Sequence, residues 1–166
     1  MITLAIDPSG NFEEGKGHTG IASMKNGNWD TVSVSSVNAR DYETRFKYWT
    51  AVKKVIQDYV LEGEQLQVVI ENYVVRANGF TTGKMPETAM LIGVLVYFCE
   101  MHNIPVYFQS PAHAKSRFKD ELIPTYIPNM KLVGNKYYLG SKLTNDHERD
   151  ALKHLLYFKR YREYKI

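Results

Sequence analysis

The sequence contains a single cysteine and lacks any long uncharged hydrophobic run. Because Cys99 is the only cysteine, no disulfide can form within one chain, and a reducing compartment is expected. Cys99 lies in an apolar stretch, so it is expected to be buried and unreactive. The longest uncharged apolar run, residues 89–99, is shorter than the roughly 20 residues of a membrane-spanning helix. A secretory signal would need an uninterrupted apolar segment, and Asp7 interrupts the first apolar stretch of this sequence. These absences predict a cytoplasmic protein with no membrane partner.

The sequence also lacks internal repeats, low-complexity segments and linkers. With 44% hydrophobic and 23% charged residues, the 166-residue chain has the composition of a soluble globular protein, which predicts one domain over residues 1–166. The net charge of +3 is unevenly distributed: residues 1–75 contain 7 Lys/Arg and 10 Asp/Glu, whereas residues 76–166 contain 14 and 8. Early acidic groups and late basic groups suit a nuclease, in which carboxylates bind metal and basic groups bind phosphate, although many solvated surfaces carry such an excess.

Hydrophobic periodicity predicts three antiparallel strands followed by alternating helices and strands. The expected strands cover residues 2–8, 20–24, 29–37, 67–71 and 104–108, and the expected helices cover residues 41–61, 86–102 and 111–119. A last helix begins after Asn145, because Glu148 three residues later completes a capping-box pattern. The segment 120–145 has no regular period and supports no assignment. A strand meander continued by helical crossovers predicts an α/β fold, with a mixed five-stranded sheet flanked by helices.

Two carboxylates end strands that are otherwise apolar. Asp7 closes the first strand and Glu71 closes the run 68–70, and a charged carboxylate is costly to bury in such a place without a partner. If these strands are neighbours, the two carboxylates emerge together and repel each other unless a cation lies between them. The alternatives are that Asp7 caps the next turn and that Glu71 reaches solvent at a sheet edge.

The beginning of the last helix carries a third group of titratable side chains. His147 and Asp150 are three residues apart, so they project from one helix face, and His154 lies on the same side one turn further on. That spacing can place an imidazole and a carboxylate on one ion. The alternative is an acidic first turn stabilised by the helix dipole, which we favour for Asp146 and Glu148.

Convergence of these groups would support phosphodiester hydrolysis. Mg²⁺ and Mn²⁺ prefer oxygen ligands, and such ions can lie in pairs about 3.5–4 Å apart, where one activates the attacking water and the other stabilises the leaving oxygen. Such a site needs groups supplied by the first strand, the fourth strand and the last helix. The pattern therefore predicts a nuclease with two Mg²⁺ or Mn²⁺ ions per active site.

Three motifs together resemble those of the RuvC family of Holliday-junction resolvases. Ile6-Asp7-Pro8-Ser9 with Thr19-Gly20, then Val69-Ile70-Glu71, then the run His-Glu-Arg-Asp-Ala-Leu at 147–152 occur in the family's order across nearly the whole chain. The resemblance implies an RNase H-like fold and a structure-selective endodeoxyribonuclease. It further implies a homodimer that nicks two strands of a four-way DNA junction symmetrically. The implied catalytic and metal-binding residues are Asp7, Glu71, His147 and Asp150.

Some positions depart from the motifs of the cellular bacterial enzymes. Ser9 stands where glycine is usual, and the interval from Asp7 to Thr19 is longer. Both departures make the chain similar to bacteriophage-encoded members, so a bacterial cell or a phage-infected host is the expected setting. The family places an aromatic wedge just after the second acid, and Tyr73 is the nearest aromatic residue here.

Basic residues near these motifs are candidates for DNA contact, although a solvated charge explains each one equally well. With Tyr73, the predicted DNA-binding set is Arg76, Lys84, Lys115, Arg117 and Lys119. The apolar helix 86–102 is a candidate dimer interface. No residue pattern bears on a helicase partner.

Three other functions are consistent with parts of the pattern. A ribonuclease H-type enzyme would act on RNA–DNA hybrids with the same acidic residues. A non-catalytic DNA-binding module would keep the fold without turnover, but the complete set of acidic residues argues against it. An actin-like ATPase would need paired glycine-rich phosphate loops and a longer chain, and neither is evident.

Overall fold

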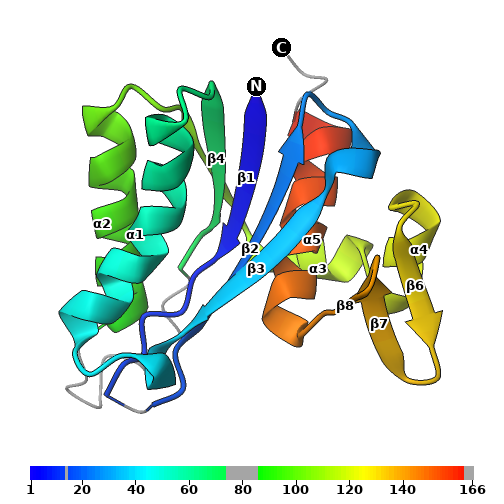
Figure 1. The fold of residues 1–166 in the computed structure, drawn as a ribbon, viewed down its shortest axis with the longest axis horizontal. Coiled ribbons are helices and arrows are strands. Elements are labelled where there is room, and N and C mark those ends of the chain that lie inside the picture. The colour runs from blue at the N-terminus through cyan, green and yellow to red at the C-terminus, as the bar shows by residue number, and fades with distance from the viewer. Residues whose placement is uncertain (14, 74–85, 163–166) are drawn as a thin grey trace.

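The computed structural model describes residues 1–13, 15–73 and 86–162, and its centre is a five-stranded sheet (Figure 1). The strands are β1 (Ile2–Asp7), β2 (His18–Lys25), β3 (Ser33–Asn38), β4 (Leu66–Glu71) and β5 (Val106–Gln109). Their order across the sheet is β3-β2-β1-β4-β5. The pairs β1–β2 and β2–β3 are antiparallel, whereas β1–β4 and β4–β5 are parallel. The predicted mixed sheet is confirmed.

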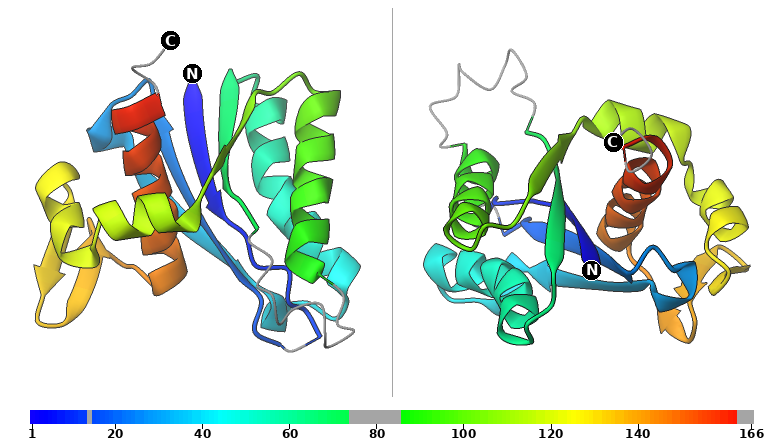
Figure 2. Two further views of the ribbon diagram at one scale, coloured as in Figure 1. Left: turned by 180° about the vertical axis from the view of Figure 1, so that it is seen from behind. Right: turned by 90° about the horizontal axis from the view of Figure 1, so that it is seen from above.

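Helices cover both faces of this sheet. The longer ones are α1 (Arg45–Leu61), α2 (Glu87–Met101) and α5 (Asp146–Tyr157), and α5 continues as a π-helical turn over Phe158–Arg162. Helices α1 and α2 lie on one face and α5 lies on the other, with α3 (Pro111–Arg117) packed against α5 (Figures 1 and 2). In the described part of the chain, no helix is both long enough and apolar enough to cross a membrane.

Alternation along β1 divides the core into two clusters. Leu4 and Ile6 pack with α1 and α2, whereas Ala5 packs with α5, because successive side chains of a strand point to opposite faces. The small side chains of Ala5 and Ala22 allow α5 to lie close to the sheet. Asp7 follows the same alternation and therefore faces α5.

Glycine is required where α5 comes closest to β2. A Cβ atom at Gly20 would lie 1.9 Å from the carbonyl oxygen of His147, so any larger residue would push the start of α5 away. Gly20 pairs with Asp7 across β1 and β2. The glycine of the Thr19-Gly20 motif therefore sets the distance between the end of β1 and the helix that carries Asp150.

The segment that supported no assignment forms a second, smaller sheet. Its strands are β6 (Met130–Val133), β7 (Lys136–Leu139) and β8 (Lys142–Leu143), which pair antiparallel in that order. It is preceded by the 3₁₀ turn η4 (Asp120–Leu122) and the single-turn helix α4 (Ile123–Tyr126). Strands this short carry too few alternations to produce a readable period.

Local capping changes two predicted boundaries. The strand expected from residue 29 begins at Ser33, because Trp29–Thr31 form the 3₁₀ turn η1, capped by the Asn28 side chain. The helix expected from residue 41 begins at Arg45: Thr44 caps it, and Ala39–Asp41 form the turn η2. These short turns bury too little to show a period in the sequence.

Candidate active site

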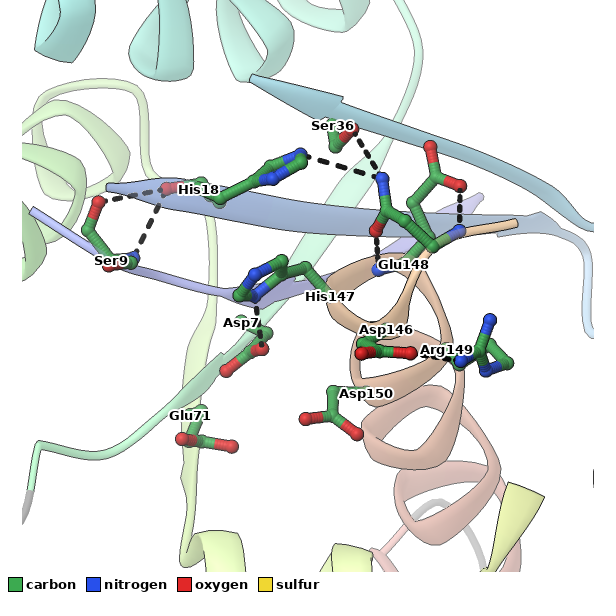
Figure 3. Close-up of polar contacts among 12 residues, drawn as sticks. Asp7, Ser9, His18, Ser36, Glu71, Asp146, His147, Glu148, Arg149 and Asp150 are labelled. Carbon is green, nitrogen blue, oxygen red and sulfur yellow. Dashed lines mark hydrogen bonds and ion pairs between the residues drawn. The ribbon is translucent and has the colours of Figure 1, made fainter. Parts of the chain in front are cut away.

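The two strand-end carboxylates lie next to each other at one edge of the sheet. Strands β1 and β4 are parallel with Ile6 opposite Ile70, so Asp7 and Glu71 form the next pair along. Neighbouring strands are about 4.8 Å apart, and paired residues of parallel strands point to the same face. Asp7 is only 7% exposed. Both carboxylates therefore face α5 (Figure 3).

Helix α5 supplies the third side of the site. Its predicted capping box is present: Asn145 Oδ1 accepts from the Glu148 amide at 2.9 Å, and Glu148 Oε2 accepts from the Asn145 amide at 3.1 Å. This cap orients the first turn so that His147 and Asp150 face the ends of β1 and β4 (Figure 3). The four residues predicted as the metal-binding set thus lie together.

The other two acids of this helix have structural partners. Asp146 is exposed and pairs with Arg149, while Glu148 is buried and accepts from Lys142 Nζ at 2.8 Å besides capping the helix. Both acids therefore stabilise the start of α5.

A lysine occupies the centre of the acidic cluster. Lys115 Nζ, carried by α3, lies 2.9 Å from Glu71 Oε2, 3.0 Å from Asp150 Oδ2 and 3.5 Å from Asp7 Oδ1. Partial burial opposes its charge, but the three carboxylates outweigh this effect and raise the pKa of Lys115. The positive charge of the Lys115 ammonium reduces the repulsion among the three carboxylates and so allows them to lie close together.

The three carboxyl groups differ in how well their charge is compensated. Burial raises the pKa of Asp7, and the negative charges of Glu71 and Asp150 raise it further. For Glu71 burial acts in the same direction, but hydrogen bonds from His154 and Lys115 lower its pKa overall. Asp150 has a lowered pKa against burial because Lys153 and Lys115 donate to it. Asp7 is thus the acid with most to gain from an additional cation.

Two histidines lie at the outer side of Asp7. His147 Nδ1 is 3.9 Å from Asp7 Oδ2, too far for a hydrogen bond but close enough for the carboxylate to raise the pKa of His147. The ring of His18 lies 4.6 Å from that of His147, and burial together with this neighbour lowers the pKa of His18. Sequence reasoning missed His18, which directly precedes the Thr19-Gly20 motif at the start of β2 but is not part of it.

A hydrogen-bond network holds the loop that follows Asp7. The Ser9 amide donates to Thr19 Oγ1 at 3.2 Å, and the Tyr48 hydroxyl donates to the Ser9 carbonyl. Tyr48 Oη also lies 2.9 Å from Thr19 Oγ1. Burial raises the pKa of Tyr48 to about 12, so its hydroxyl remains a donor at neutral pH. The threonine of the Thr19-Gly20 motif therefore fixes the chain directly after Asp7.

The carboxylate oxygens of the cluster are suitable ligands for a divalent cation, whereas their present distances from one another suit the ammonium group of Lys115. Among the described residues, no three His, Cys, Asp or Glu side chains are spaced to hold a metal ion as they stand, because Asp7, Glu71 and Asp150 surround Lys115 Nζ. Their oxygens are the ligands that Mg²⁺ and Mn²⁺ prefer. A divalent ion would compete with Lys115 for these oxygens and relieve the repulsion from Glu71 and Asp150 that, in addition to burial, raises the pKa of Asp7.

A pocket of about 330 Å³ opens beside the cluster. It lies between the end of β4 and the first turns of α2 and α3, and its lining includes Glu71, Tyr73, Thr88, Pro111 and Lys115. Tyr73 is partly exposed. The pocket provides room for part of a substrate within reach of the carboxylates.

The structure separates the residues predicted to contact DNA. Tyr73 and Lys115 line the pocket, whereas Arg117 lies over the Tyr161 ring and donates to its hydroxyl at 3.2 Å. Lys119 is exposed beyond the end of α3. Arg76 and Lys84 lie outside the described residues.

Comparison with known proteins finds solved structures with a similar fold, but no matching family model and no curated relative. No family model matches the sequence, and no curated protein matches it. Two solved structures of Thermus thermophilus RuvC, one of them in complex with a Holliday junction substrate, superpose with TM-scores of 0.60 and 0.61. The matches cover 94% of this chain and 90% and 92% of those chains, at 14% sequence identity.

The chain has the fold of RuvC. The predicted RNase H-like arrangement, with three antiparallel strands continued by parallel crossovers, is confirmed by this similarity and by the observed sheet. At 14% identity the likeness to RuvC concerns the fold alone, so it does not test the assignment of individual residues.

Proposed function

We propose that this protein is a structure-selective endodeoxyribonuclease that resolves Holliday junctions by metal-dependent phosphodiester hydrolysis. The observation that carries the proposal is the meeting of Asp7, Glu71 and Asp150, from three separate elements, around one positive charge. Thermus thermophilus RuvC, which has a similar fold, is in complex with a Holliday junction substrate in one of the two solved structures.

The acidic cluster is the proposed binding site for two Mg²⁺ or Mn²⁺ ions. Asp7, Glu71 and Asp150 would hold them, with His147 at the outer side. Bound there, such ions supply an activated water and stabilisation of the leaving oxygen. Lys115, released from the carboxylates, would bind a phosphate of the substrate, and His147 is exposed enough to exchange a proton with solvent at its ring.

A two-fold dimer is the proposed active assembly, because a four-way junction presents two equivalent strands for cleavage. Helix α2 offers an apolar surface for it. The exposed apolar side chains on this helix are Met90, Val94, Tyr97 and Met101. Burying such a face against a second copy would remove it from water.

The test compares synthetic four-way junction, duplex and RNA–DNA hybrid substrates, each with Mg²⁺, Mn²⁺ or EDTA. The parent is expected to make paired symmetric nicks in the junction only when metal is added. Asp7→Asn should abolish these nicks, whereas the matched control Asp146→Asn should not, because Asp146 is exposed and outside the cluster.

Other outcomes identify the alternatives. Preferential cleavage of the hybrid would replace the proposal with a ribonuclease H-type activity. Junction binding without cleavage under any of these conditions would indicate a non-catalytic DNA-binding module. Equal cleavage by Asp7→Asn and the parent would show that the reaction occurs elsewhere.

A further inference from the structure

A buried histidine contacts Glu71 from behind the acidic cluster. His154 on α5 is fully buried. Its Nε2 lies 2.6 Å from Glu71 Oε2, and its Nδ1 lies 3.0 Å from the side-chain amide of Gln109. Gln109 is itself only 2% exposed. The contacting side chains of Glu71, His154 and Gln109 therefore connect the site to the interior of the protein.

The hydrogen bonds define which ring nitrogen carries the proton. A carboxylate only accepts, so His154 Nε2 donates to Glu71. With the Gln109 amide turned so that its nitrogen faces the ring, that nitrogen donates to Nδ1 at 3.0 Å and to the His154 carbonyl at 3.2 Å. The Gln109 oxygen then accepts from the Phe158 amide at 3.3 Å. The opposite orientation would place two acceptors against each other.

The backbone brings these three side chains together. Glu71 and Gln109 are paired on the parallel strands β4 and β5 and so point to the same face, which α5 covers. His154 follows Asp150 by four residues, so both project from one side of α5. One helix thus carries a cluster carboxylate and the residue that holds a second one.

We propose that His154 and Gln109 form a positioning pair, which fixes the Glu71 carboxylate and thereby sets the affinity of the site for divalent cations. The inference rests on the proposed function in so far as Glu71 binds metal. His154 acts through Glu71 and is not itself one of the residues that line the pocket. Loss of such outer partners of a metal ligand lowers affinity or activity about 10–100-fold.

Two amide substitutions separate positioning from packing. In His154→Gln the side-chain nitrogen reaches as far as Nε2 and can still donate to Glu71. In His154→Asn the nitrogen reaches only as far as Nδ1 and cannot. Both variants are neutral amides, so they share the loss of the ring. His102→Gln, at an exposed position after α2, is the control for a histidine change elsewhere.

The first readout is binding of Mn²⁺ alone, measured from the free-ion electron paramagnetic resonance signal, with thermal unfolding as a check on folding. His154→Gln and His102→Gln should bind close to the parent, and His154→Asn about 10–100-fold more weakly. Equal loss in His154→Gln and His154→Asn, with both folded, would overturn the proposal because packing alone would then explain the histidine.

The second readout is the nitrogen NMR spectrum of the histidines. The parent should show His154 protonated at Nε2 and unprotonated at Nδ1. Gln109→Glu replaces the donor facing Nδ1 with an acceptor, so the unprotonated Nδ1 signal should disappear. A parent ring protonated at Nδ1, or a spectrum that Gln109→Glu leaves unchanged, would overturn the pairing.

These measurements do not depend on the substrate. A parent protein that binds Mn²⁺ and shows the expected tautomer, but cuts no junction, would contradict the proposed function and still support the positioning pair. A His154→Asn variant that cuts junctions as fast as the parent at Mn²⁺ concentrations that limit the parent's rate would retain the function and contradict the positioning pair.

Discussion

The two faces of the central sheet bury different chemistry. On the face covered by α1 and α2, the residues of β1 and β4 are all aliphatic, and the buried polar residues of β2, Thr19 and Ser23, are uncharged. The face covered by α5 is aliphatic only in part. Its polar members are Thr3, Gln67, Asp7, Glu71 and Gln109. The first face supplies apolar burial, and the second keeps charged groups that need partners to remain inside.

This difference shows how one sheet can be both scaffold and site. An isolated buried carboxylate would be protonated or would destabilise the fold, and here each acid is kept by a partner on an adjacent element. Substitutions of the acids on the α5 face should therefore change metal binding and cleavage far more than stability, and substitutions of the aliphatic residues packed on the other face should do the reverse.

The largest expected effect is on the α5 face. Asp7→Asn should lower junction cleavage by more than the roughly 100-fold that outer partners of a metal ligand cost. Its thermal unfolding temperature should be equal to or above that of the parent, because removal of one charge relieves repulsion from Glu71 and Asp150. Cleavage assays and thermal unfolding of the same preparations check both parts. A large drop in unfolding temperature would contradict the account.

On the opposite face, Ile56→Ala should lower the free energy of unfolding by about 2–5 kcal/mol, because Ile56 is fully buried in α1. The folded fraction should cleave as the parent does. Phe46→Ala on the same helix is the control: Phe46 is 79% exposed, so its change should stay within about 0.5 kcal/mol. Urea unfolding checks the pair, and equal effects would mean that the packing of α1 is misassigned.

Lys115→Met should have opposite effects on two ligands. Mn²⁺ should bind more tightly, because the competing ammonium among the carboxylates is removed. Junction DNA should bind more weakly at low salt, with the slope of log K against log salt reduced by about 0.9. Titrations across a salt series measure this. Lys119→Met, an exposed control outside the cluster, should leave Mn²⁺ binding unchanged; a matching Mn²⁺ effect there would contradict the competition.

The smallest expected effect concerns acid stability. Burial opposes the charge of Asp120, but Lys153 and Arg149 lower its pKa below 3.8. A depressed folded-state pKa stabilises the protein above the unfolded pKa, and this contribution is lost as the pH falls through the folded value. Asp120→Asn should therefore be less stable than the parent by roughly 1 kcal/mol at neutral pH. The difference should shrink below about pH 4 in unfolding curves, and a constant difference would contradict the ion pairing.

Much of the site was readable because its signals are local. Apolar runs ending in Asp7 and Glu71 marked two strand ends, and the capping box marked the first turn of α5. Once β1 and β4 are neighbours, strand alternation alone directs both acids toward α5.

The residues whose roles were missed depend on contacts between distant elements. Lys115 was expected at phosphate and lies among the acids, because α3 packs against α5. Gln109 belongs to no sequence motif. For its partner His154, helical spacing showed only that it lies on the same side of the helix as His147 and Asp150. On α1 the buried aromatic residue is Tyr48, whereas Phe46 is exposed, because the Tyr48 hydroxyl contacts Ser9 and Thr19. Such choices are made by tertiary packing rather than by local pattern.

The most direct test of the central claim is a crystal structure grown with Mn²⁺ and measured at the manganese absorption edge. Anomalous density is expected between Asp7, Glu71 and Asp150, with Lys115 Nζ moved away from all three carboxylates. A structure with Lys115 still between the acids, and manganese absent or bound elsewhere, would contradict the central claim.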